Sequence, residues 1–261
     1  MPETAAIPRR AWVEQIMGLP VSIHLRGAAL GSSRVERQIA AVFADLRHAD
    51  RVFSTYREDS DLSRWERGAL PLADADPTLA VVMELCEQAR LRTEGWFDAR
   101  RLPDRRGDRL RYDPSGLVKG WAVKRAARHL TGLVETSWCI NAGGDVLVYA
   151  PAGQPPWRVG IEDPANPARV LRIIARAGGA VATSGATHRG AHIIDPYAGR
   201  AATAVRAVTV VGPDLMWADV YATAAVARGP QALTWLADVD GYEALLVDRL
   251  GAVHSTPGWP G

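Results

Sequence analysis

The sequence has little lysine, little cysteine and no long apolar run. Two of its 31 basic residues are lysines, Lys119 and Lys124, and 29 acidic residues leave a formal charge of +2. A net charge so close to zero argues against a protein that binds nucleic acid through a basic face. No run approaches the roughly eighteen apolar residues that a membrane span needs, so we expect no contact with a membrane.

The two cysteines, Cys86 and Cys139, stand far apart in the chain. This spacing fits neither a zinc site nor a redox pair, so we expect two buried, reduced thiols. Residues 1–17 lack the apolar core of a signal peptide and any cysteine that could take a lipid. We therefore expect a cytoplasmic protein with a flexible segment at 1–9 and a single domain at 10–258.

The sequence contains both helical and strand periodicity. Apolar residues three or four apart predict helices at 35–52, 77–94, 119–133, 213–228 and 231–238. A capping box at Ser33 and Glu36 precedes the first helix, and Asp76-Pro77 opens the second. Alternating runs predict strands at 21–25, 138–141, 146–149, 157–161, 170–175, 181–183, 192–194, 205–211, 243–247 and 252–255. Consecutive strands without helices between them favour an α+β fold in which helices flank mixed or antiparallel sheets.

Two glycine-rich segments suit the close approach of a ligand. At 113–124, a glycine turn leads into a helix, where exposed amides and Lys119 suit phosphate, although a solvated lysine at a helix start is the commoner explanation. The segment 141–145 reads Asn-Ala-Gly-Gly-Asp between two strands. It either admits a ligand or forms an ordinary tight hairpin.

Two further segments carry ionisable side chains. His192 suits proton transfer at neutral pH, unless it is a satisfied core histidine. Ser184 lacks the GxSxG turn of a serine hydrolase. Asp219 and Thr223 are four residues apart on an apolar helix and therefore face the same way. Hard oxygen ligands of this kind suit Mg²⁺, and a surface aspartate beside a threonine bonded to its own helix is the alternative.

Taken together, these segments resemble the FAD:protein FMN transferase family, ApbE. Each motif is short, but seven in the family's order are specific. The motifs are MG at 17–18, FSTY at 53–56 with SDLSR at 60–64, GWFD at 95–98, DPSGLVKGWAV at 113–123, NAGGD at 141–145, ATSG at 182–185 with HIIDP at 192–196, and ADVYATA at 218–224.

The resemblance implies an ApbE-like (T-fold-like) enzyme that splits FAD with Mg²⁺ and attaches FMN to a Thr or Ser of an acceptor protein. The acceptor would carry a D-x-x-(S/T)-G-A-T-like motif, and AMP would leave. His192 and Asp219 would be catalytic, and Asp219, Thr223 and the Gly116 carbonyl would bind the metal. The residues implied to contact FAD are Met17, Ser54, Thr55, Tyr56, Trp96, Phe97, Asp98, Asp113, Lys119, Asn141, His192 and Ile193.

Alternatives from other classes remain open. In an FAD pyrophosphatase, water would replace the acceptor hydroxyl at the same metal site, whereas a non-catalytic flavin-binding protein would retain FAD without turnover. The segment 184–187 copies the end of the acceptor motif, so Thr187 is a hypothetical site of self-modification. Because arginine replaces lysine almost everywhere, Lys119 is expected to occupy a site that requires a compact ammonium.

Overall fold

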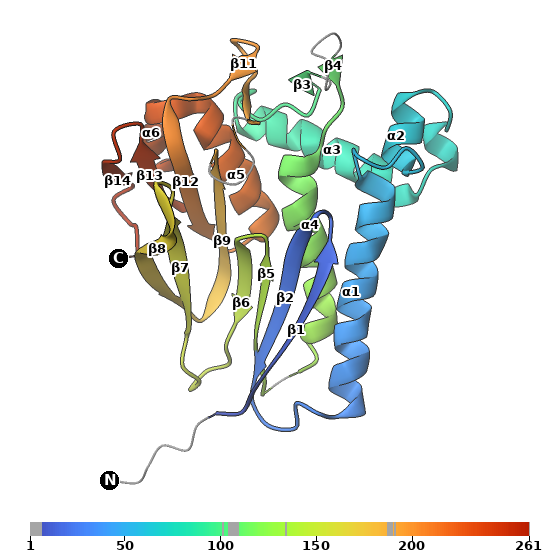
Figure 1. Ribbon diagram of the computed structural model, residues 1–261, viewed down its shortest axis with the longest axis vertical. Coiled ribbons are helices and arrows are strands. Elements are labelled where there is room, and N and C mark those ends of the chain that lie inside the picture. Colours follow the sequence, from blue (N-terminus) through green and yellow to red (C-terminus); the bar gives the residue numbers. More distant parts are fainter. Residues whose placement is uncertain are drawn as a thin grey trace.

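One large antiparallel sheet organises the chain (Figure 1). The computed structural model describes residues 7–100, 102–103, 110–133, 135–186, 190 and 192–260. Eight strands form the sheet in the order β1-β2-β5-β6-β9-β12-β13-β14, and every neighbouring pair is antiparallel. Their bounds are β1 (Arg9–Ile16), β2 (Leu19–Arg26), β5 (Ser137–Ala142), β6 (Asp145–Tyr149), β9 (Gly178–Gly185), β12 (Val205–Gly212), β13 (Glu243–Asp248) and β14 (Val253–Ser255).

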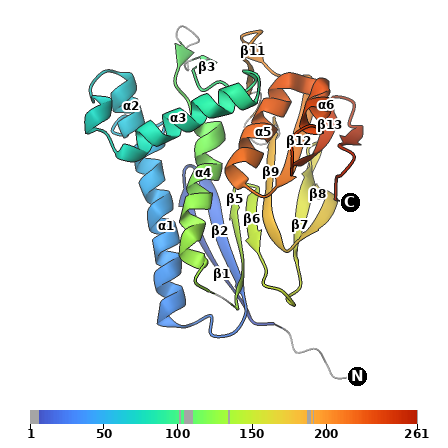
Figure 2. The same ribbon diagram turned by 180° about the vertical axis from the view of Figure 1, so that it is seen from behind.

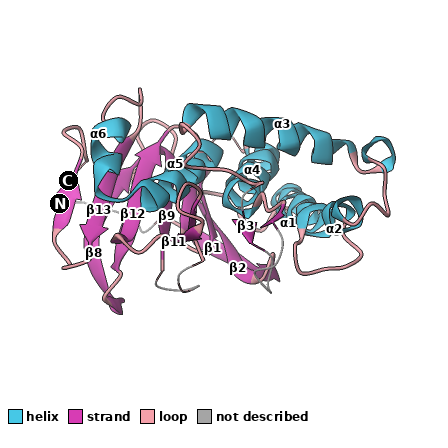
Figure 3. Cartoon of the chain, turned by 90° about the horizontal axis from the view of Figure 1, so that it is seen from above, coloured by secondary structure: helices cyan, strands magenta, loops and turns pink. Residues whose placement is uncertain are grey.

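Helices cover one face of this sheet. Figure 2 shows α1, α4 and α5 in front of the strands, and Figure 3 separates a helical layer from a layer of strands. The helices are α1 (Ser33–Phe53), α2 (Asp61–Glu66), α3 (Pro77–Arg92), α4 (Ser115–Ala127), α5 (Leu215–Arg228) and α6 (Ala232–Leu236), with 3-10 turns η1 (Leu72–Asp74), η2 (Arg128–Leu130) and η3 (Gly229–Gln231). No helix in the described part of the chain is long and apolar enough to cross a membrane.

A ribbon of two strands, β7 (Trp157–Asp163) and β8 (Asn166–Arg176), packs against the opposite face. Because successive side chains on a strand point to opposite faces, Leu147 and Ala182 join the core under the helices, while Val146 and Val181 pack with the ribbon. Two small pairs complete the described strands: β3 (Leu102–Pro103) with β4 (Leu110–Arg111), and β10 (Ile194–Asp195) with β11 (Arg200–Ala201). The sheet therefore has a core on each face.

The predicted α+β class is confirmed, and each predicted helix is present. The elements β1, α2, η1, β3, β4 and β11 were not predicted, and β1 already includes Arg9, which the sequence pattern had placed in the flexible terminus. Ser32, not Ser33, caps α1, because Ser32 has extended backbone angles and its side chain accepts a hydrogen bond from Val35 N. Asp76 caps α3 as predicted.

Three other predictions need correction. Helix α4 begins four residues earlier than predicted, because Asp113 Oδ1 accepts a hydrogen bond from Ser115 N, so Gly116 lies inside the first turn. The strand predicted at 192–194 is wrong, since β10 begins at Ile194. Both cysteines are free, and burial raises the pKa of each thiol to about 12, but Cys139 is half-buried rather than fully buried.

Candidate active site

A lysine lies at the centre of a cluster of charged residues from three elements. Lys119, on α4, places its Nζ 2.6 Å from Asp145 Oδ2 and 3.6 Å from Asp219 Oδ1. Asp145 begins β6 and Asp219 lies on α5; their side chains are 1% and 2% exposed, whereas that of Lys119 is 19% exposed. Asp145 Oδ1 also accepts a hydrogen bond from Thr183 N on β9, at 3.1 Å. The fold thus brings residues far apart in sequence into one buried charge cluster.

Asp145 and Asp219 each have a buried Oδ2 without a hydrogen-bond partner, but Asp145 Oδ2 is ion-paired with Lys119 Nζ at 2.6 Å. Burial raises the pKa of Asp219 above its usual range; the Lys119 ammonium opposes this rise, and the Asp145 carboxylate adds to it. Two carboxylates face one ammonium, so when both are ionised the cluster carries excess negative charge. A cation beside Asp219 would neutralise that charge and give Oδ2 a partner.

The close approach of α4 and α5 depends on Gly120. A Cβ built on Gly120 would lie 2.7 Å from Leu215 O and 2.8 Å from Met216 Cα, both backbone atoms at the start of α5. No side chain fits between the helices at this point. The neighbouring Lys119 can therefore reach Asp219, which lies one turn further along α5.

Thr223 and Gly116 lie beside each other next to the charge cluster. Thr223 Oγ1 is 3.1 Å from Ser184 Oγ, and a Cβ built on Gly116 would lie 3.2 Å from Thr223 Oγ1. The three predicted metal ligands, Gly116, Asp219 and Thr223, line one cavity of about 130 Å³.

The donor set suits Mg²⁺ better than a metal that needs several protein ligands. Within the described ranges, no three His, Cys, Asp or Glu side chains gather as a metal cluster. An ion here would rest on Asp219 and on neutral oxygens, and it would complete its coordination with water or phosphate. Mg²⁺ is commonly bound in this way.

His192 lies on an irregular segment just before β10, and its side chain is exposed. Its Nδ1 is 3.0 Å from Gly190 O. In the neutral ring, an Nδ1–H that donates to this carbonyl leaves Nε2 able to accept a proton. His192 is exposed and therefore is not a satisfied core histidine, and it lines three cavities.

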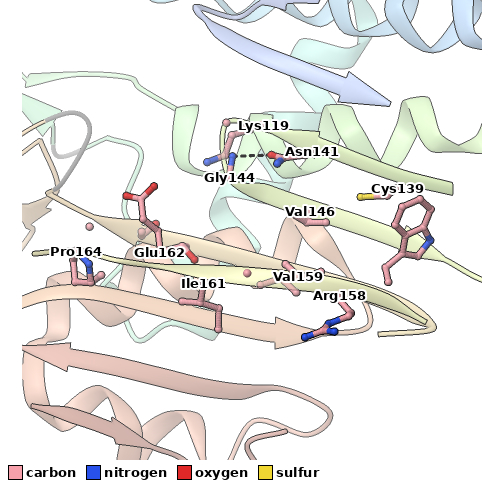
Figure 4. Close-up of a pocket in the computed structure, with 18 of the residues that line it drawn as sticks. Lys119, Cys139, Asn141, Gly144, Val146, Arg158, Val159, Ile161, Glu162 and Pro164 are labelled. Atoms are coloured by element: carbon pink, nitrogen blue, oxygen red, sulfur yellow. Dashed lines mark hydrogen bonds between the residues drawn. The ribbon is translucent and has the colours of Figure 1, made fainter. Parts of the chain in front are cut away.

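Three cavities meet at Lys119 and His192, since both residues line all three. The largest, about 840 Å³, is lined by the predicted FAD-contacting residues Met17, Ser54, Thr55, Tyr56 and Asp113. The cavity of about 130 Å³ includes Trp96, Phe97, Asp98, Asp113 and Ile193. Asn141 lines the third, about 410 Å³, where its Oδ1 accepts a hydrogen bond from Gly144 N (Figure 4). Every residue predicted to contact FAD thus lines at least one cavity of this junction.

Two features of the sequence cannot be placed. Thr187 and residues 104–109 of the arginine-rich stretch lie outside the described residues. The end of that stretch is described, and Arg111 Nη2 lies 2.6 Å from Asp113 Oδ2.

The model of the ApbE family matches residues 17–103 and 100–246 of this chain. The chain belongs to the ApbE family. A relative from Vibrio cholerae named FAD:protein FMN transferase is 28% identical over 256 residues, covering 77% of this chain and 76% of the relative. One of the same name from Rhodobacter capsulatus is 32% identical over 157 residues, which span 57% of this chain but 30% of the relative's own length.

Solved structures from the ApbE family share the fold. The ApbE protein from Thermotoga maritima superimposes with a TM-score of 0.80 at 23% identity, over 96% of this chain and 97% of that one. The flavin transferase ApbE from Vibrio cholerae gives a TM-score of 0.79 at 22% identity, over 97% and 98% of the two chains.

Two polar residues of this ApbE site were not among the predicted site residues. Asp145 closes the NAGGD motif, and its role was missed because an aspartate after paired glycines also suits an ordinary hairpin. Its place at the start of an apolar strand was the available signal, since a buried carboxylate needs a partner. Ser184 was considered as a hydrolase nucleophile and as part of two motifs but not as a site residue, whereas it lies within hydrogen-bond distance of Thr223.

Proposed function

We propose that this chain transfers FMN from FAD to a Thr or Ser hydroxyl of an acceptor protein and releases AMP. The observation that carries the proposal is the buried cluster of Lys119, Asp145 and Asp219 at the junction of three cavities. The relatives of this chain that are named FAD:protein FMN transferase support the same activity.

Lys119 supplies the fixed positive charge for the pyrophosphate of FAD. Its ammonium is held between two carboxylates and keeps part of its surface open to the cavities. Such a preorganised charge stabilises the additional negative charge of a phosphoryl-transfer transition state. Asp113, Trp96 and Tyr56 line the adjoining cavities, where the two halves of FAD would extend.

Asp219, Thr223 and the Gly116 carbonyl would hold Mg²⁺. The unpartnered Asp219 Oδ2 and the excess negative charge of the cluster support this assignment. When bound, the metal supplies charge neutralisation for the pyrophosphate oxygens.

His192 Nε2 accepts the proton of the acceptor hydroxyl. The hydroxyl oxygen forms a bond to the phosphorus of the FMN half, and the bridging P–O bond breaks. AMP leaves with the electron pair of that bond, and the hydroxyl proton stays on His192. The exposure of His192 supports this role, because the hydroxyl arrives on another protein.

We place the reaction in the cytoplasm as part of the same proposal, on the ground that both cysteines are free. The acceptor would then be a cytoplasmic protein with the D-x-x-(S/T)-G-A-T-like motif.

A test uses the purified protein with FAD, Mg²⁺ and a synthetic peptide that carries the acceptor motif. We expect covalent flavin on the peptide by mass spectrometry and one AMP per flavin transferred, with both products lost when EDTA removes the metal. AMP and free FMN without peptide modification would indicate an FAD pyrophosphatase. Retention of FAD without AMP would indicate a flavin-binding protein and would contradict the proposed transfer.

A further inference from the structure

The third cavity at the junction is a groove that contains few of the residues expected to contact FAD: Lys119 and His192, which line all three cavities, and Asn141. It has a volume of about 410 Å³ and lies between the β7–β8 ribbon and strands β5, β6 and β9. In Figure 4, the labelled β7 residues lie along one side, from Arg158 to Glu162, and Asn141, Cys139 and Val146 lie along the other. One end of the groove reaches Lys119, and Ser184 and His192 also line it.

One side of this groove is the edge of a strand. Each residue from Trp157 to Glu162 lines the cavity, although successive side chains of a strand point to opposite faces. Consecutive lining of this kind arises when a cavity runs along the edge of the strand. In the part of the chain that the structure describes, β7 pairs with no strand other than β8. Along the residues from Trp157 to Ile161, the edge facing the groove is therefore available for main-chain hydrogen bonds.

The groove is lined by both apolar and polar side chains. Val146, Val159, Ile161 and Val181 belong to the smaller core and also line the cavity. Arg158 is exposed at the rim. At about 3.3 Å per residue, the five residues from 157 to 161 form an edge about 16 Å long, enough for an extended segment of about five residues.

We infer that the acceptor protein binds in this groove as an extended segment that pairs with the free edge of β7 and places its hydroxyl at the Lys119 end. This inference rests on the proposed function, which requires a protein substrate at the junction. The two other cavities can accommodate the two halves of FAD, since together they contain eleven of the twelve residues expected to contact it. A row of main-chain donors and acceptors matches a peptide strand, whereas an adenosine has no matching repeat.

Binding to a strand edge would explain how the enzyme recognises a short motif in the acceptor protein. A peptide added to a strand edge gains affinity from its main chain, and alternate side chains face the groove. The Gly and Ala that precede the final Thr of the acceptor motif are small, so the chain next to the reacting hydroxyl would occupy little space beside Ser184, which lines the groove. Continuity with the transfer site separates this groove from an unrelated apolar surface.

The first experiment compares two matched charge reversals, Arg158→Glu and Arg172→Glu. Arg158 lines the groove on β7, whereas Arg172 is exposed on β8 and does not line it. With the motif peptide as acceptor and saturating FAD, Arg158→Glu should raise KM for the peptide about tenfold, because the peptide carries the motif's aspartate. Arg172→Glu should leave KM unchanged, and both variants should bind FAD as the parent does.

A second variant tests whether the peptide occupies the groove, because a larger side chain would reduce the volume of the groove. Cys139 lies on β5 at the part of the groove away from Lys119 (Figure 4), and it lines the cavity. Cys139→Phe should narrow the groove and reduce transfer of flavin to the peptide about tenfold. The melting temperature of the variant would be measured to confirm that it folds.

A crosslinking experiment tests where the peptide binds. A photoreactive residue at position 158 should crosslink to the peptide, and the same residue at position 172 should not.

The outcomes separate the two proposals. If the unmodified protein transfers flavin but neither groove variant changes KM for the peptide and no crosslink forms at 158, the docking site is wrong and the transferase activity stands. If Cys139→Phe weakens FAD binding instead, the groove holds the nucleotide and the inference is overturned. If the peptide crosslinks at 158 but FAD is never cleaved, the docking site stands and the proposed activity fails.

Discussion

The site has two halves that are built differently. The half formed by α4 and α5 carries Lys119 and Asp219 in a buried cluster, held by two helices in contact at Gly120. The half formed by β7 and the segment before β10 carries the exposed His192 and the edge of a strand that no other described strand except β8 joins. Charges that act on the pyrophosphate need fixed positions and little water, whereas a protein substrate needs an open surface. Variants in the first half should therefore affect both cleavage and transfer, and variants in the second should affect transfer alone.

The largest effect is expected from Asp219→Asn. The variant keeps the size of the side chain but removes the charge that would hold Mg²⁺. AMP release and flavin transfer should both fall by about 1000-fold, since both depend on charge stabilisation at the pyrophosphate. The melting temperature without metal should not fall, because a buried carboxylate with an unpartnered oxygen has been removed. AMP release within tenfold of the parent would remove Asp219 from the metal site.

His192→Gln should produce the next largest effect. Loss of the base should reduce transfer to the peptide by about 100-fold, which is typical of a general base. Because the ring is exposed, the melting temperature should be unchanged. His254→Gln is a matched control, since His254 pairs with Asp248 away from the cavities and should keep full transfer. Equal transfer by the two variants would show that His192 is not the base.

These two halves also differ in how far the sequence predicts them. The helical half was largely predictable, because the spacing of Asp219 and Thr223 places them on one helix face and Lys119 stands out in an arginine-rich chain. The ion pair between Lys119 and Asp145 was not predictable, since it depends on which strand lies beside α4. The position of His192 was predicted as a strand and is irregular, because two apolar residues, Ile193 and Ile194, are too few to distinguish a strand from a loop.

The groove could not be predicted from local patterns at all. The sequence pattern predicts both strands of the ribbon, but it does not show which edge of β7 lacks a partner. That edge depends on the sheet order, in which β6 pairs with β9 and leaves the ribbon apart. Long-range pairing of this kind carries no signal within a single segment of sequence.

Lys119→Arg should have an intermediate effect and tests the buried cluster directly. The ammonium lies 2.6 Å from Asp145 in a site that is largely buried, so a longer, planar guanidinium would not fit the same geometry. We expect about a tenfold loss of kcat for AMP release. Lys124→Arg is the matched control, because Lys124 is 53% exposed and pairs with Asp214 at the surface. Full activity in Lys119→Arg would show that any cation suffices there.

The smallest effect is expected from Gly120→Ala, which touches neither substrate nor metal. The added methyl group would meet Leu215 O and Met216 Cα, so α4 and α5 must separate slightly. Such overpacking costs about 1–3 kcal/mol and should lower the melting temperature, while AMP release falls about threefold. Gly31→Ala is the control, since its methyl group would meet no atom within 4 Å. Because the displacement would separate Lys119 from Asp219 without changing His192, the loss should appear equally in cleavage and in transfer. A loss confined to transfer would mean that the two halves of the site are mechanically coupled.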